Sequence, residues 1–169
     1  RVARGKCNKV VVSRPLVPCG EDLGFLPGSL AEKMNPYIQP YLDVLKVIVG
    51  DAAPKILGTF EPLPLAFCRG RTFGEGVIAC LDEAQNISVE QLHAFLTRIG
   101  VGGRIIVSAD PTQCDRPIGC DHLVKIADEL EKAGVAAVVR FETQHVVRSP
   151  LIPAINRAFA RVREAMPAR

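Results

Sequence analysis

Hydrophobic and polar positions along the chain follow two recurring patterns, short apolar runs and longer amphipathic stretches. Short apolar runs are typical of strands in a buried parallel sheet, and they occur at Lys9–Arg14, Val77–Leu81, Arg104–Asp110 and Val135–Phe141. Apolar residues at helical spacing predict amphipathic helices, and these occur at Pro40–Gly50, Ser88–Gly100, Leu123–Gly134 and from Ser149 onward. This alternation predicts an α/β domain with a mainly parallel sheet flanked by helices.

Local signals refine the ends and faces of some of these elements. Ser88 followed three residues later by Gln91 forms a capping box, which marks the start of a helix. The last helix is predicted to begin with Ser149 as its cap. Its buried face is expected to consist of Ile152, Ile155, Phe159 and Val162. Leu63–Gly70 fits either a strand or an extended loop, because its prolines disfavour a central strand.

Composition indicates one folded domain. The chain has 169 residues, of which 48% are hydrophobic, and this is enough for one sizeable core. We therefore expect residues 1–169 to form a single domain. No apolar stretch reaches the roughly 20 residues that cross a bilayer, and the first residues lack the apolar region of a signal peptide. These features predict a cytoplasmic protein without a membrane partner.

Charge and cysteine content add little on their own. The net charge of +3 is too small to indicate a nucleic-acid partner. Basic residues gather near both ends of the chain, and either a solvated surface or contact with nucleic acid explains them. The six cysteines show no CxxC spacing, so we expect reduced thiols rather than a metal centre.

Two of the predicted strands end in an aspartate. Asp82 follows the apolar run Val77–Leu81, and Asp110 ends the run that begins at Arg104. In open parallel sheets, ligands bind outside the carboxyl ends of the strands, so both acids are expected to share one site. Mg²⁺ selects oxygen ligands, and an aspartate at a strand end is a suitable ligand. The sequence therefore predicts a Mg²⁺ site at this edge.

Neighbouring side chains suggest hydrolysis of a nucleoside triphosphate at that edge. Glu83 can orient or deprotonate a water molecule, and the amides of Gln85 and Gln113 can contact a terminal phosphate. Each glutamine stands three residues after an aspartate, a repetition that an ordinary solvated loop does not require. An Asp-Glu pair at a strand end also occurs in such loops, and that interpretation stays open.

Several longer motifs point to a known family. They are GFLPGSLAEKMNPY, PLAFCRGRTF, LDEAQN, FLTRIG, SADPTQCDRP and VVRSPLI. Together they closely resemble the PhoH-like, phosphate-starvation-inducible ATPases, from about Val10 to about Val162. The resemblance implies a RecA-like P-loop NTPase core similar to the first domain of superfamily 1 helicases. It also implies ATP or another nucleoside triphosphate and Mg²⁺ as cofactors, and a homo-oligomer such as a ring.

The same resemblance implies roles for individual residues. Asp82 matches the Walker B magnesium ligand, Glu83 the general base, and Gln85 a sensor of phosphate and water. Asp110 and Gln113 match the helicase motif GDxxQ, in which an alanine here replaces the glycine.

Four arginines complete the implied site. Arg148 resembles the helicase arginine that meets the γ-phosphate, although a structural salt bridge explains it equally. Arg71 is implied as a phosphate contact, and Arg69 and Arg14 as nucleic-acid contacts. Solvated loop charges remain the alternative for Arg69 and Arg71.

One expected motif does not occur. The phosphate-binding loop GxxxxGK[ST] is absent from the 169 residues, although such a loop supplies the main donors to the phosphates. We therefore expect the domain to be incomplete at its N-terminus. In RecA-like sheets the strand before that loop is central, so its neighbours are expected to expose an unpaired edge.

Two classes of function follow. The first is a Mg²⁺-dependent ATPase coupled to nucleic acid, with RNA favoured over DNA. The alternative is a nucleic-acid-binding or ring-assembly module that does not depend on nucleotide and has lost catalysis.

Overall fold

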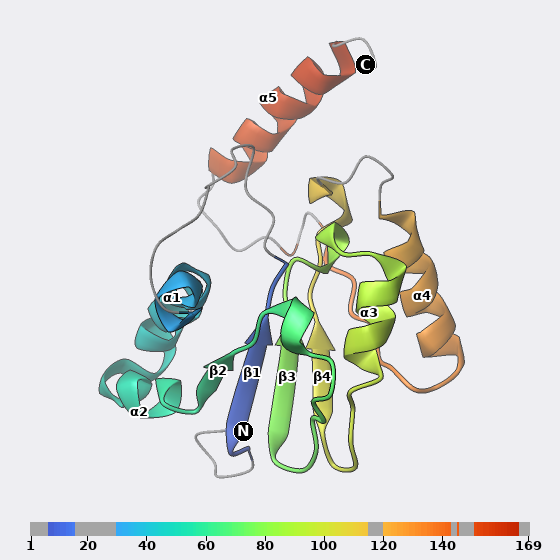
Figure 1. The fold of residues 1–169 in the computed structure, drawn as a ribbon. Helices are drawn as coiled ribbons and strands as arrows, with labels where there is room; N and C mark the ends of the chain where they lie inside the picture. Colours follow the sequence, from blue (N-terminus) through green and yellow to red (C-terminus); the bar gives the residue numbers. More distant parts are fainter. Residues whose placement is uncertain (1–6, 16–29, 115–119, 143–144, 146–150, 166–169) are drawn as a thin grey trace. The chain divides into compact units, whose positions relative to one another are not determined.

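The computed structural model describes residues 7–15, 30–114, 120–142, 145 and 151–165. The chain divides into two compact units, Arg1–Ile126 and Ala127–Arg169. The first unit contains the sheet and the helices that cover it, and Figure 1 shows their arrangement.

Four parallel strands form the sheet, which confirms the predicted fold class. They are β1 (Lys9–Ser13), β2 (Phe60–Pro62), β3 (Val77–Leu81) and β4 (Arg104–Val107). Their order is β2-β1-β3-β4, and each neighbouring pair is parallel (Figure 1). The β-branched residues of β1 suit this pleated surface. Because all four strands run the same way, their carboxyl ends meet at one edge of the sheet.

The register of β1 and β3 divides their side chains between two cores. Val11 pairs with Ala79, and both belong to the larger cluster of buried residues. Val12 pairs with Cys80, and both belong to a smaller cluster on the other face. The strands are therefore covered on both sides, as their continuous apolar runs predict.

Five α-helices accompany the strands in the described part of the chain. They are α1 (Leu30–Val49), α2 (Ala53–Leu57), α3 (Val89–Leu96), α4 (Asp121–Lys132) and α5 (Leu151–Ala165). Short 3₁₀ turns lie between them at η2 (Gly50–Ala52), η3 (Leu65–Phe67), η4 (Ala84–Asn86) and η5 (Pro111–Gln113). Figure 1 shows α1 and α2 beside β2, and α3 beside β3 and β4.

Helix α3 begins as predicted. The hydroxyl of Ser88 accepts a hydrogen bond from the Gln91 amide nitrogen at 3.2 Å, and Gln91 Oε1 accepts one from the Ser88 amide at 2.9 Å. This reciprocal capping box satisfies two backbone donors. The helix places Leu92 and Phe95 in the larger core, where the rings of Phe95 and Phe73 lie 5.3 Å apart.

One strand prediction is wrong in the described structure. Val135–Phe141 forms no strand there, and Phe141 is 83% exposed. An apolar run becomes a strand only when a neighbour accepts its hydrogen bonds, and this run has no such neighbour among the described residues. For Leu63–Gly70 the sequence left a strand and an extended loop open, and the structure has a loop there that contains the 3₁₀ turn η3. The strand in this region, β2, is short, ends at Pro62 and precedes the predicted segment.

Two helix predictions also need correction. Helix α1 does not begin at Pro40 but ten residues earlier, so both Pro36 and Pro40 lie inside it. In α5, Ile155, Phe159 and Val162 are exposed, so the predicted buried face is not buried against the described residues. The cap predicted at Ser149 lies outside the described residues. Helical periodicity identifies an apolar face but does not supply the partner that buries it.

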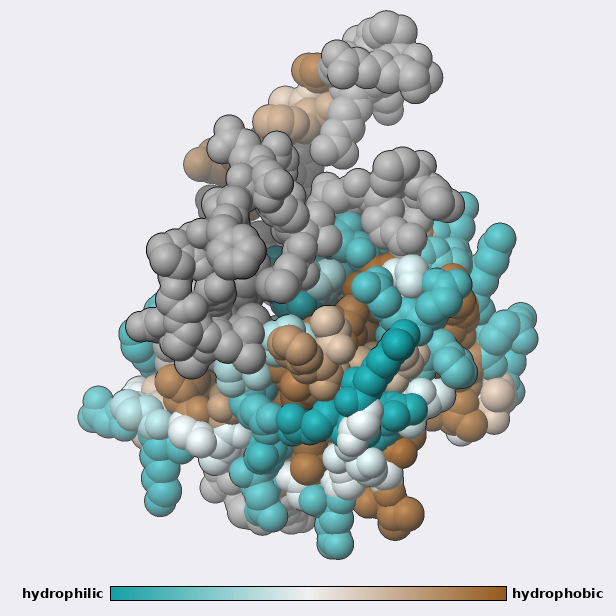
Figure 2. Space-filling view, in the orientation of Figure 1, coloured by the Kyte–Doolittle hydropathy of each residue, from teal (hydrophilic) through white to brown (hydrophobic). Residues whose placement is uncertain are grey.

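The described surface mixes polar and apolar side chains. Figure 2 shows hydrophilic residues over much of one face, with smaller hydrophobic areas between them. None of the described helices combines the length and the apolar character needed to cross a membrane.

Candidate functional site

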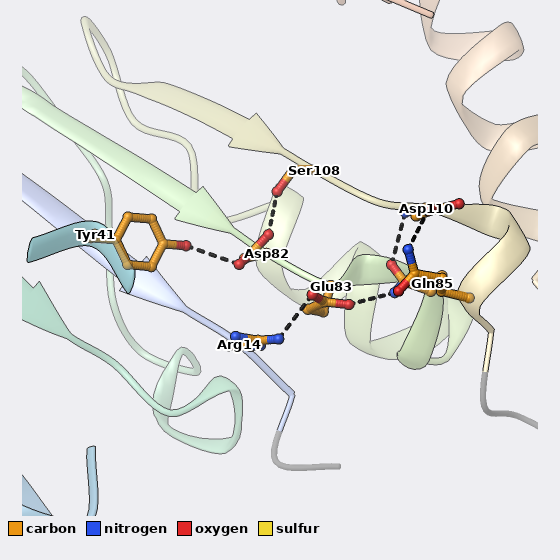
Figure 3. A network of polar contacts seen from close by, with 8 residues as sticks. Arg14, Tyr41, Asp82, Glu83, Gln85, Ser108 and Asp110 are labelled. Atoms are coloured by element: carbon orange, nitrogen blue, oxygen red, sulfur yellow. Dashed lines mark hydrogen bonds and ion pairs between the residues drawn. The ribbon is translucent and has the colours of Figure 1, made fainter. Parts of the chain in front are cut away.

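The two acidic strand ends lie at one edge of the sheet, as predicted. The backbone beyond the strands is held in place, because the Asp82 amide donates to Ser13 O at 2.9 Å and the Ser108 amide donates to Leu81 O at 2.9 Å. The Ala84 amide then donates to Ser108 O at 3.0 Å. These bonds join the segments that follow β1, β3 and β4, and Figure 3 shows the polar side chains that they bring together.

Both carboxylate oxygens of Asp82 accept a hydrogen bond from a hydroxyl group. Ser108 Oγ donates to Oδ1 at 2.6 Å, and Tyr41 Oη donates to Oδ2 at 3.2 Å (Figure 3). Burial of the Tyr41 phenol raises its pKa well above the ordinary value of 10, and the negative charge of Asp82 raises it further. Tyr41 therefore stays a hydrogen-bond donor to Asp82 at neutral pH.

Glu83 adopts a left-handed backbone conformation, with φ of 53° and ψ of 39°. Among the described residues, Glu83 is the one non-glycine residue whose φ is positive. Its side chain forms an ion pair with Arg14, 2.8 Å from Nη2 of Arg14 to Oε1 of Glu83, and its other oxygen accepts a hydrogen bond from Gln85 at 2.6 Å. Backbone strain of this kind gathers at functional sites, where the surrounding contacts maintain it.

The Gln85 side chain joins the two acidic segments. Its Nε2 donates to Glu83, and its Oε1 accepts a hydrogen bond from the Asp110 amide at 3.1 Å (Figure 3). The residue is fully buried, with 0% exposure. In this conformation the amide links protein groups to each other. Its predicted role as a sensor of phosphate and water stays a prediction.

Asp110 caps the 3₁₀ turn that follows β4. Its Oδ1 accepts hydrogen bonds from the amide and the hydroxyl of Thr112, at 2.9 and 2.7 Å, and its Oδ2 accepts one from Gln113 Nε2 at 2.6 Å. The hydroxyl of Thr112 is the main cause that lowers the pKa of Asp110 below its ordinary value. Gln113 therefore lies beside the Gln85–Asp110 link, and its predicted contact with a phosphate stays a prediction.

The predicted arginines do not all join this network. Arg14 does, through Glu83, although it was predicted as a nucleic-acid contact. Arg71 forms an ion pair with Glu61 of β2 at 2.7 Å, and its predicted phosphate contact stays a prediction. Arg69 is exposed, and Arg148 lies outside the described residues.

Sequence reasoning missed three features of the site. Tyr41 was included only in the helix that precedes β2, and nothing in its spacing indicates a contact with Asp82. Ser108 offered a signal, because it directly follows β4 on the same segment as Asp110. The pairing of Arg14 with Glu83 was accessible from the topology, since β1 and β3 are parallel neighbours that end together.

The donors at Asp82 fit a hard cation. Carboxylate and hydroxyl oxygens of Asp82 and Ser108 lie together, and Mg²⁺ prefers one or two carboxylates together with water and phosphate oxygens. No group of three His, Cys, Asp or Glu residues suited to a metal occurs in the described ranges. These residues therefore do not form a metal site made of protein ligands alone, but they fit a cation that a phosphate ligand also coordinates.

Comparison with known proteins agrees with these motifs. The family model of the PhoH-like protein matches residues 1–160. The chain is 42% identical over 151 residues to Protein PhoH of Escherichia coli strain K12. The matched stretch covers 85% of this chain and 42% of that protein. It is 41% identical over 161 residues to a PhoH-like protein of Mycobacterium bovis, which covers 93% of this chain and 46% of that protein.

A third relative gives the same result. The chain is 39% identical over 160 residues to the PhoH-like protein of Bacillus subtilis, which covers 92% of this chain and 50% of that protein. The chain thus spans about half the length of these curated relatives. On the family match and these identities, the chain belongs to the PhoH-like protein family, with an α/β domain of the P-loop NTPase type.

Proposed function

We propose that these residues form the hydrolytic part of a Mg²⁺-dependent ATPase. The observation that carries the proposal is the hydrogen-bonded connection of Glu83 through Gln85 to Asp110, beside the Asp82–Ser108 pair, at the carboxyl edge of a parallel sheet. Ligands of open α/β sheets bind at this edge. Membership of the PhoH-like family supports the same reaction class.

Each residue has a definite task in this proposal. Asp82 supplies the carboxylate oxygen for the cation, because both of its oxygens keep a free lone-pair direction after accepting one hydrogen bond. Glu83 accepts the proton of the attacking water. Arg14 and Gln85 hold one carboxylate oxygen of Glu83 each, so that its direction is fixed before the substrate binds. Mg²⁺, when bound, would neutralise the charge of the phosphates.

Phosphate binding needs further donors. The 169 residues contain no GxxxxGK[ST] loop, and the Arg14 and Arg71 guanidinium groups are paired with Glu83 and Glu61. Hydrolysis should therefore be measured on this chain and on a version extended at its N-terminus. We expect turnover in the extended chain and little or none in the 169 residues alone.

The decisive variant is Glu83→Gln in the extended chain. It keeps the size of the side chain but removes the base, so hydrolysis should fall by about 10²–10⁴-fold while ATP binding persists. Glu129→Gln changes an exposed carboxylate of α4 and serves as the control with unchanged turnover. Turnover that survives Glu83→Gln would show that Glu83 is not the base and would remove the main support for the proposal.

Coupling to nucleic acid and assembly into a homo-oligomer are further parts of the proposal. Arg69 is exposed and suits contact with a phosphate backbone. Turnover with and without added RNA or DNA tests the coupling. RNA binding that weakens steeply with salt, but that neither ATP nor the Glu83→Gln substitution changes, would favour the alternative function, a nucleic-acid-binding module that has lost catalysis.

A further inference from the structure

The carboxylate of Asp82 is held from two directions by elements far apart in the sequence. Ser108 approaches Oδ1 from the segment after the neighbouring strand β4. Tyr41 approaches Oδ2 from α1 and precedes Asp82 by 41 residues in the sequence. Figure 3 shows the two hydroxyl groups approaching the carboxylate from different directions. The Ser108 contact follows from strand pairing, whereas the Tyr41 contact depends on the placement of α1.

Packing fixes the Tyr41 ring behind its hydroxyl. The ring centroid lies 6.3 Å from that of Phe60 on β2, and Tyr41 packs against the smaller core of the sheet. Ile78 and Cys80 of β3 contact that core as well. The phenol therefore stands on the sheet face from which Asp82 also projects, with its oxygen at the strand end.

We propose that Tyr41 is a positioning residue for the metal-binding carboxylate of Asp82. This inference rests on the proposed function, because it assumes that Asp82 holds the cation. One hydrogen bond to each oxygen fixes the rotation of the carboxylate, so the remaining lone pairs point in a constant direction. Partners that orient a metal ligand in this way typically contribute 10–100-fold to metal affinity.

The inference also predicts a connection between α1 and the metal site. A cation at Asp82 withdraws electron density from Oδ2 and changes the hydrogen bond that Tyr41 donates. The position of α1 is then sensitive to occupation of the site. A purely structural tyrosine, which only covers the core, would not respond to the metal.

Tyr41→Phe separates these roles, because it removes the hydroxyl and keeps the ring. Binding of Mn²⁺ is measured by electron paramagnetic resonance, with the metal alone and with ATP. We expect the variant to bind Mn²⁺ about 10-fold more weakly or worse. It should also need correspondingly more Mg²⁺ for half-maximal hydrolysis, with unchanged turnover at saturating Mg²⁺. Gln39→Ala, which changes an exposed side chain of the same helix and keeps the Tyr41 hydroxyl, should retain wild-type affinity.

A second measurement leaves the Tyr41 side chain in place. The chain contains two tyrosines, so 3-fluorotyrosine gives two fluorine resonances, and Tyr37→Phe assigns them. The Tyr41 resonance should shift when Mg²⁺ is added to the wild type and stay unchanged in Asp82→Asn.

The outcomes distinguish the inference from the proposed function. Three results would overturn the inference alone, provided that Asp82→Asn abolishes binding. They are wild-type Mn²⁺ affinity in Tyr41→Phe, equal weakening by Gln39→Ala, and a Tyr41 fluorine resonance that does not shift when Mg²⁺ is added. Wild-type protein without any Asp82-dependent binding of Mn²⁺ would overturn both.

Discussion

Glu83 combines a strained backbone with the side chain proposed as the base. A left-handed conformation costs a non-glycine residue about 1–2 kcal/mol, because Cβ approaches the following carbonyl oxygen. Its ion pair with Arg14 and its hydrogen bond from Gln85 hold the side chain in the network. The strained residue is therefore also the one proposed as the base.

This strain predicts a reversed order of stability for two variants. Glu83→Gly and Glu83→Ala lose the same side-chain contacts, but only glycine adopts positive φ without cost. Glu83→Gly should therefore be more stable than Glu83→Ala by about 1 kcal/mol in urea unfolding. At Glu129 in α4 the order should be the opposite, since glycine disfavours a helix by about 1 kcal/mol. Equal stability of the two Glu83 variants would contradict the strain.

The sequence predicts which residues of the site lie at strand ends but not how they bond. Asp82 and Asp110 were placed at one edge because parallel strands end together. The burial of Gln85 between them depends on the 3₁₀ turn η4 and on the conformation of Glu83. The contact of Tyr41 with Asp82 depends on the packing of α1 against the sheet. These features come from tertiary contacts that residue spacing does not encode.

At the scale of elements, the pairing of β1 with β2 includes an ion pair. Glu61 of β2 accepts from Lys9 of β1 at 2.9 Å and from Arg71 at 2.7 Å. The hydrogen bond from Lys9 is the largest cause that lowers the pKa of Glu61 below its ordinary value of 4.5, and Arg71 lowers it further. A lowered pKa in the folded state stabilises the fold above the unfolded value, and this contribution disappears as the pH falls through the folded value.

Glu61→Gln should therefore reduce stability at neutral pH and have a shrinking effect below about pH 4.5, the ordinary value for this side chain. The loss should be small, about 0–1 kcal/mol, because the Lys9 side chain is 49% exposed. Urea unfolding at several pH values measures it. Glu129→Gln, in a more exposed pair with Lys132, should show almost no difference at any pH. A Glu61→Gln effect of constant size across the pH range would contradict the assignment.

Elements with their own partners were predicted well, and those without them were not. Strand β3 pairs on both sides and α3 carries its own capping box, so sequence signals and tertiary contacts agree. Val135–Phe141 has the composition of a strand, but no described strand pairs with it. Helix α5 has a regular apolar stripe whose residues remain exposed. In both cases the pattern describes a surface that requires a partner.

At the scale of the molecule, the sheet has an open edge at β4. In the described residues β4 pairs with β3 alone, and Ile106 on that strand is 53% exposed. An exposed strand edge with apolar side chains readily pairs with another chain. The 169-residue chain is therefore expected to associate through the β4 edge.

Ile106→Lys tests this expectation, because a charge on an edge strand opposes pairing with another strand. Light scattering of the wild-type chain should show a mass that rises with concentration above the 18.3 kDa of one chain. The variant should remain close to that mass. Val101→Lys is the matched control. Val101 is 95% exposed in the turn before β4, so this substitution adds the same charge at a position away from the edge. If Val101→Lys suppresses association equally, net charge rather than the β4 edge governs it. If the wild type stays monomeric throughout, the open edge does not drive association.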